Sequence, residues 1–223
     1  MGTQRKILEP FKGDAFAELR GQVAVLFSLG QAQGRDFEGE ITDNLRASRE
    51  EGADHQMVPT ARTIDSRSFV HGYTADTTRE QIAEAVRAGL KQMMPGEGAD
   101  LGWMTTLVVK TLRRLLESGE PSGEKSFYFP LIDGLSIVRF DLKLRYADVT
   151  VPELRQAVEK IIVVAAAKSV ADLDALDPRR VLPIYQQALT NADTSAHEIQ
   201  QEMERAFFAI RQIKDLHRSR LRR

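Results

Sequence analysis

The most regular pattern in the chain is an alternation of apolar and charged residues near its middle. One run alternates at every position: Val138, Arg139, Phe140, Asp141, Leu142, Lys143, Leu144, Arg145 and Tyr146. A period of two predicts a strand with one face in the core and one charged face in water. A second apolar arm precedes this run, and between them stands Asp133-Gly134, a dipeptide that type I′ turns favour. The pattern therefore predicts an antiparallel β-hairpin over about residues 127–149.

Apolar residues in most of the remaining chain recur at steps of three and four, which is typical of amphipathic helices. Such stripes predict helices over residues 77–94, 100–118, 150–168 and 195–223, and a further helix that begins at Asp177-Pro178. Residues 14–27 and 37–45 carry two more stripes, which form either a helical hairpin or one long kinked helix. Trp103, in the first turn of helix 100–118, is expected in the core.

Several helix boundaries follow from local sequence. Thr77 and Glu80 have the spacing of a capping box, and Asp177-Pro178 has the order of an N-cap followed by a first-turn proline. Pro183 predicts a break near Leu182, because proline has no N–H and its ring clashes with the preceding turn. The apolar run at residues 161–167 is far too short to span a bilayer, so we expect it to be a buried part of helix 150–168.

Together these elements predict an α+β fold that is mainly helical, with a central antiparallel β-hairpin (about 127–149) packed by amphipathic helices. Residues 1–50 are expected to form an N-terminal helical arm. Residues 51–76 read as an irregular connecting segment, with at most a short strand around Ser68–Val70. Residues 77–223 are expected to form the main α+β domain, which ends in an amphipathic C-terminal helix.

Composition and charge narrow the function classes. The chain has 223 residues, a formal net charge of −1 and no cysteine. It therefore has no disulfide, no thiolate metal site and no global field that attracts nucleic acid. We find no apolar signal-peptide core and no run of about 20 apolar residues. These features favour a soluble, cytoplasmic protein.

Catalytic motifs are nearly absent, so an enzyme is the less favoured interpretation. Residues 119–126 resemble a phosphate loop but have Glu124 where glycine must precede the lysine. None of the four histidines has a second histidine at the spacing of a helical metal pair. We therefore expect no cofactor and no metal site. The enzyme alternative is a site assembled around residues 54–76, where His71 and Asp65 are the test positions.

The C-terminal helix carries the clearest signal for a partner. Ile199, Met203, Ala206, Ile210 and Ile213 follow the alternating steps of four and three of a coiled-coil seam for about two heptads, and Phe207 lies beside them. The predicted interface consists of Ile199, Met203, Phe207, Ile210 and Ile213. The end of the helix is basic, and four arginines there are candidates for contact with an anion: Arg218, Arg220, Arg222 and Arg223.

The leading interpretation is thus a non-enzymatic structural or assembly protein that acts by self-association or by binding another protein. One alternative is a membrane-active protein, either pore-forming or lipid-binding, in which helices 77–94 and 100–118 open from the hairpin. Nucleic acid is a less favoured partner, because the charged face of the hairpin has no aromatic residues for stacking on bases. No small-molecule substrate is evident from the sequence.

Overall fold

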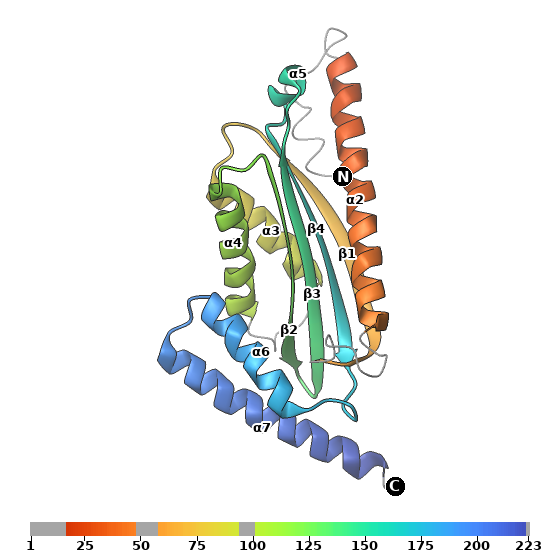
Figure 1. Cartoon of the computed structure of the whole chain (residues 1–223), viewed down its shortest axis with the longest axis vertical. Helices are drawn as coiled ribbons and strands as arrows, with labels where there is room; N and C mark the ends of the chain where they lie inside the picture. The colour runs from red at the N-terminus through yellow and green to blue at the C-terminus, as the bar shows by residue number, and fades with distance from the viewer. Residues whose placement is uncertain (1–16, 48–57, 94–100, 222–223) are drawn as a thin grey trace.

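The computed structural model describes residues 17–47, 58–93 and 101–221 (Figure 1). In chain order, the elements are α2 (Ala17–Ala47), β1 (Thr60–Tyr73), α3 (Arg79–Met93), α4 (Leu101–Glu117), β2 (Ser122–Asp133), β3 (Ser136–Asp148), α5 (Pro152–Arg155), β4 (Lys160–Ala171), α6 (Pro178–Asn191) and α7 (Ala196–Leu221). Helix α2 lies along one face of the sheet, helices α3, α4 and α6 cover the other, and α7 packs on α6 at the lower end (Figure 1). The predicted α+β fold with a central hairpin is confirmed.

The four strands form one antiparallel sheet in the order β1-β4-β3-β2. Strands β2 and β3 are the arms of the predicted hairpin, and Asp133 pairs with Ser136 at its end. The central residues of the turn are therefore Gly134 and Leu135. Gly134 has a φ of +58°, whereas Leu135 has no positive φ, which is the pattern of a type II′ turn. The predicted hairpin is correct, and the predicted type I′ turn is wrong.

Lys160–Ala171 form strand β4, so the helix predicted over residues 150–168 is wrong. Only the single turn α5 is helical there, and β4 lies between β1 and β3. Both faces of β4 are buried, because Ile162 and Val164 face the main core while Val163 and Ala165 lie beneath α2. A strand buried on both faces has a continuous apolar run without a period of two, so its sequence resembles that of a buried helix.

Strand β1 lies within the segment 51–76 that the sequence analysis described as irregular. The predicted short strand around Ser68–Val70 is part of a strand of 14 residues. The register of β1 against β4 shifts at two points, between Thr60 and Arg62 and between Thr63 and Asp65. This edge strand is polar and partly exposed, so it has no clear period-of-two signal. The division of the chain at residues 50 and 76 stays a prediction.

Helix α2 shows that the first helical region is one continuous helix and not a helical hairpin. Gly30 and Gly34 lie where this helix touches the sheet. A Cβ at position 30 would lie 2.8 Å from Cγ1 of Val70, and a Cβ at position 34 would lie 2.8 Å from Oγ of Ser68. Glycine at these two positions therefore permits a backbone approach that any larger residue would block.

We expect Gly34→Ala to lower the free energy of unfolding by about 1–3 kcal/mol, because the added methyl group overpacks the contact with Ser68. Gly39→Ala in the same helix is the matched control. No atom lies within 4 Å of the position that a Cβ of residue 39 would take, so this alanine should stabilise the helix by about 0.5–1 kcal/mol. Urea denaturation of the three proteins measures both changes. Equal effects of the two substitutions would contradict the close packing at Gly34.

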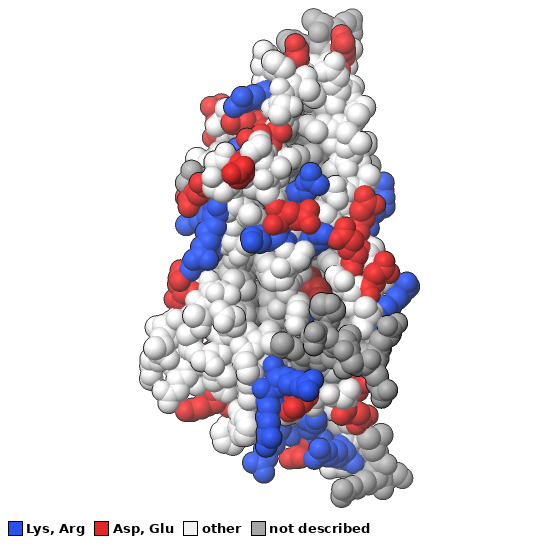
Figure 2. Space-filling model, viewed as in Figure 1, with Lys and Arg blue, Asp and Glu red and all other residues white. Residues whose placement is uncertain are grey.

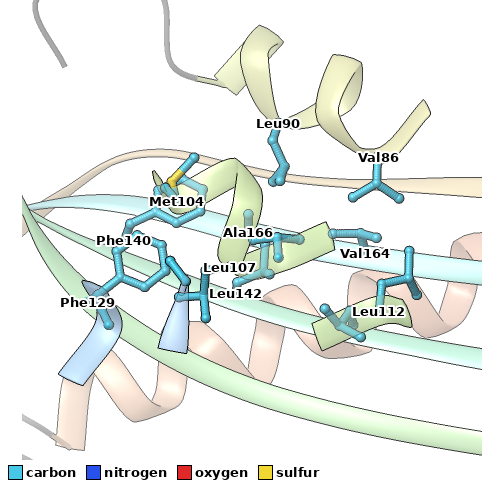
Figure 3. Close-up of a cluster of buried hydrophobic side chains, with 14 of the residues drawn as sticks. Val86, Leu90, Met104, Leu107, Leu112, Phe129, Phe140, Leu142, Val164 and Ala166 are labelled. Carbon is cyan, nitrogen blue, oxygen red and sulfur yellow. The ribbon is translucent and has the colours of Figure 1, made fainter. Parts of the chain in front are cut away.

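The main core lies between the sheet and helices α3, α4 and α6. Figure 3 shows Val86 and Leu90 of α3 and Met104 and Leu112 of α4 in one cluster with Phe140 of the sheet. The apolar stripes predicted for these two helices are thus their buried faces. This packing defines one large apolar cluster on the side of the sheet away from α2.

The charged residues of β3 are buried, which overturns the predicted wet face of the hairpin. Arg139, Asp141 and Lys143 are only 3%, 6% and 8% exposed. Helix α2 reaches over part of this face, where Lys143 pairs with Glu40 of α2 and with Glu124 at 2.9 Å. Burial raises the pKa of Asp141, an effect that the adjacent Arg139 opposes. A charged strand face is therefore compatible with burial when each charge has a partner.

Two local features of the helices differ from the sequence prediction: the capping box at the start of α3 and the position of Pro183 in α6. The capping box of α3 uses Thr78 and Gln81 and not the predicted pair Thr77 and Glu80. The Gln81 backbone amide donates to the Thr78 hydroxyl at 3.3 Å, and the Thr78 backbone amide donates to the Gln81 side chain at 2.8 Å. Helix α6 begins at the predicted Asp177 cap but continues through Pro183, where a break was expected.

Candidate functional site

The candidate site is the outer surface of helix α7, and the start of this helix is fixed by a capping box. The Ser195 hydroxyl donates to the Glu198 carboxylate at 2.6 Å, and the Glu198 backbone amide donates back to the same hydroxyl at 3.3 Å. The Ser195 backbone amide also donates to that carboxylate at 3.1 Å. These bonds satisfy backbone donors of the first turn, so α7 begins at a defined position.

The predicted interface residues of α7 divide between its two sides. Ile210 and Ile213 are buried within the chain itself, in an apolar cluster at the lower end of the sheet. Ile199 and Met203 are half-buried and pack against the main core. Phe207 is 47% exposed. The interface assignment stays a prediction, and in the single chain Phe207 is the most exposed of the five.

The outer side of α7 carries an exposed aromatic pair beside a groove. Phe208 is 64% exposed, and its ring lies 6.2 Å from the ring of Phe207. The groove has a volume of about 570 Å³, and both phenylalanines line it together with Met203, Ile199 and Gln186 of α6. An aromatic protrusion therefore lies next to an apolar hollow on one surface.

Phe208 is not among the interface residues predicted from the sequence. Neighbouring residues in a helix point about 100° apart, so Phe207 and Phe208 cannot both face a narrow core. The pair Phe-Phe in an otherwise amphipathic helix was therefore a signal that one aromatic ring lies outside the seam. The seam positions drew attention to the docked side of the helix, whereas the exposed ring lies on the other side.

Charge is distributed unevenly along α7. The first half, residues 196–207, contains three glutamates and one arginine, whereas residues 209–221 contain four Lys or Arg residues and one aspartate. Figure 2 shows Lys and Arg side chains over the lower end of the molecule, where the second half of α7 lies in Figure 1. The helix is thus acidic before Phe208 and basic after it.

The predicted anion-contacting arginines belong to this basic half. Arg218 and Arg220 are exposed at the end of α7, and Arg222 and Arg223 lie outside the described residues. Cations in the last turn of a helix interact favourably with its dipole, so Arg218 and Arg220 have a stabilising role without a ligand. Contact with an anion stays a prediction.

The enzyme alternative stays a prediction, because residues 54–57 lie outside the described residues, but its test positions Asp65 and His71 do not converge. Asp65 and His71 both lie on β1, six residues apart, which corresponds to about 20 Å along an extended strand. Asp65 pairs with Arg67 at 2.9 Å, and the His71 ring packs between Phe69 and Tyr73. Burial lowers the pKa of His71. Among the described residues, no group of three or more His, Asp or Glu side chains is arranged to hold a metal ion.

The membrane alternative rests on the helices now identified as α3 and α4. Both bury their apolar faces in the main core. Within the described ranges, no helix combines the length and the apolar character that crossing a bilayer requires. Opening of these helices toward a membrane stays a prediction.

The capping box of α7 leads to a pH-dependent prediction. The hydrogen bonds from Ser195 hold the pKa of Glu198 below its usual value. A lowered carboxyl pKa contributes stability above the pKa of the unfolded chain, and this contribution is lost as the pH falls through the folded pKa. We therefore expect Glu198→Gln to lower the melting temperature at pH 7, and the difference from the wild type should shrink as the pH falls and the wild-type glutamate becomes protonated. A thermal melt series from pH 7 to pH 3 measures this, and a constant difference at every pH would contradict it.

A scan against models of protein families, a search of curated proteins and a search of solved structures each found no match.

Proposed function

We propose that this protein is a non-enzymatic assembly protein that associates with a second copy of itself through the outer surface of α7. The observation that carries the proposal is the exposed pair Phe207 and Phe208 beside an apolar groove. In a two-fold symmetric contact, each surface meets its own copy. A protrusion next to a hollow suits such a contact, because the aromatic pair of each chain fills the groove of the other.

The charge of α7 favours an antiparallel arrangement of the two helices. Phe208 lies at the middle of the helix, which runs from Ala196 to Leu221. An antiparallel pair that crosses at Phe208 therefore places the acidic half of each helix against the basic half of its partner. In this arrangement Glu204, which precedes the crossing point, approaches Arg211 of the second copy. A parallel pair would set like charges against each other, which is unfavourable.

Light scattering behind size exclusion tests the association through the aromatic pair. We expect a dimer for the wild type and a monomer for Phe208→Glu, because a carboxylate at the centre of the contact would be desolvated without a partner. Leu29→Glu is the matched control, since Leu29 is also a strongly exposed apolar residue of a helix. This control should remain a dimer. A wild type that stays monomeric over the whole concentration range would contradict the proposal.

A charge exchange tests the antiparallel geometry separately. Glu204→Arg should weaken the dimer roughly threefold or more, because the symmetric contact occurs twice. The double variant Glu204→Arg with Arg211→Glu should recover most of the lost affinity, since it restores opposite charges at the same place. Failure of the double variant to recover affinity would exclude the proposed pairing while leaving association through the aromatic pair intact.

A further inference from the structure

A second concave surface lies on the other side of α6, at the free edge of the sheet. It has a volume of about 800 Å³ and is formed by three elements: α4, the edge strand β2 and α6. Small-molecule sites commonly have volumes of about 300–1,000 Å³ and are mostly apolar with a few polar groups. The size of this groove therefore suits a small ligand. None of its lining residues belongs to α7.

Apolar side chains line most of the groove. Strand β2 contributes Phe127 and Phe129, α4 contributes Leu107 and Leu115, and α6 contributes Ile184. The aromatic end of the groove adjoins the main core, because the ring of Trp103 lies 5.2 Å from the ring of Phe129. Phe127 is half-buried and stacks on Phe129 at 6.0 Å. These side chains form an apolar surface that a hydrocarbon chain can cover.

The opposite end of the groove is cationic. Its charged lining residues are Arg114 of α4 and Lys125 of β2, and none of the described residues that line it is acidic. Strand β2 runs antiparallel to α4 after a short turn, so Lys125 lies toward the end of α4 that carries Arg114. A close approach between Gly123 and Leu115 places the start of β2 there. The groove is thus positive at one end and aromatic at the other.

The two cations are available to a ligand. Arg114 and Lys125 are both exposed, and within the described chain neither forms an ion pair. The adjacent charges are already engaged, because Glu124 pairs with Lys143 on the opposite face of the sheet and Arg113 pairs with Glu80. Thr111 and Gln187 also line the groove and supply uncharged hydrogen-bonding groups. An anionic head group would therefore find two cations here without a competing carboxylate.

We propose that the groove between α4, β2 and α6 binds a small amphipathic carboxylate, with its head group at Arg114 and Lys125 and its apolar body along Phe127 and Phe129. The assignment of an amphipathic carboxylate depends on both the two cations and the apolar surface of the groove. A free inorganic anion would leave the aromatic surface uncovered, and a neutral hydrocarbon would leave the cations without a partner. This site is independent of the self-association proposed for α7.

Trp103 provides a direct signal for occupancy, because it is the single tryptophan of the chain and contacts Phe129 in the groove wall. The experiment titrates the full-length protein with decanoate below its micelle concentration and follows tryptophan emission and heat of binding. 1-Decanol and decyltrimethylammonium are the matched ligands with neutral and cationic head groups. We expect saturable binding of decanoate, about tenfold weaker binding of decanol, and no binding of the cation.

Substitutions then locate the head group and the chain. Arg114→Gln combined with Lys125→Gln should remove the preference for decanoate over decanol. Arg113→Gln is the control for lost charge on the same helix and should leave that preference unchanged. Gln187→Phe narrows the groove and should weaken decanoate and decanol alike, and circular dichroism melts confirm that each variant is folded.

The proposal is overturned by any of three results. The first is the absence of saturable binding. The second is equal binding of the three amphiphiles, which would show a generic apolar surface. The third is competition of an extended peptide for the groove together with no binding of decanoate, which would show that the free edge of β2 pairs with another strand. None of these results bears on self-association through α7, which the oligomeric state of the α7 variants tests separately.

Discussion

Asp141→Asn is expected to lower the free energy of unfolding by about 3–5 kcal/mol, because it leaves the buried Arg139 guanidinium without its counter-charge. The carboxylate of Asp141 accepts hydrogen bonds from Arg139 Nη2 at 2.7 Å and from Arg139 Nε at 3.0 Å. The guanidinium also lies 4.0 Å from the centre of the Tyr128 ring. Asparagine can retain part of this geometry but cannot neutralise the charge.

Two controls test whether the loss of stability comes from an unpaired buried charge. One removes both charges of the pair, and the other breaks a more exposed pair. The double variant Arg139→Met with Asp141→Leu should recover most of the stability, because apolar residues of similar size avoid the cost of burying ions. Asp65→Asn breaks the more exposed pair with Arg67 and should change stability by less than about 1 kcal/mol. Urea denaturation measures all three. A loss below about 1 kcal/mol for Asp141→Asn would contradict the buried position of this pair.

Ile210→Asp is expected to cost several kcal/mol of folding stability, because it places a carboxylate in an apolar cluster. Ile210 is 3% exposed and packs with Ile213, Ile137 and Val181 at the lower end of the sheet. Phe208→Asp is the matched comparison in the same helix, since Phe208 lies on the outer side of α7. We expect that substitution to change the stability of the monomer by less than about 1 kcal/mol.

The measurement for this pair of variants is chemical denaturation at a protein concentration where the chain is monomeric. Under that condition the effect of Ile210→Asp reports packing within one chain. A variant that retains full stability while losing association would mean that Ile210 faces a second copy, as the coiled-coil spacing alone suggested. Loss of stability in both variants would contradict the exposed position of Phe208.

The hairpin and most helices were predictable because each has one face in the main core and another face outside it. Val138 and Phe140 face the core while their neighbours do not, so the period of two is visible in the sequence. The same alternation identified which side chains share a face but not what covers each face. The charged face of β3 was therefore assigned to water, whereas α2 and neighbouring side chains bury Arg139 and Lys143.

The errors of the sequence analysis have a common physical origin. Strand β4 is apolar on both faces, and the first half of β1 is polar on an exposed edge, so neither strand has a clear alternation. The candidate surface of α7 was predicted in part, since the predicted interface included Phe207, beside the seam, but not Phe208. The groove at β2 was not predictable, because it joins residues of three elements that only the folded chain brings together.

Distance measurement between spin labels tests the antiparallel pairing of α7 most directly. The chain has no cysteine, so a single introduced cysteine at Gln201, Asp215 or Ser219 carries the only label. A crossing at Phe208 predicts equal separations along the helix axis of about 21 Å for positions 201 and 215, and about 33 Å for position 219. Equal distances at all three positions, or no dipolar coupling between chains, would contradict the proposed association.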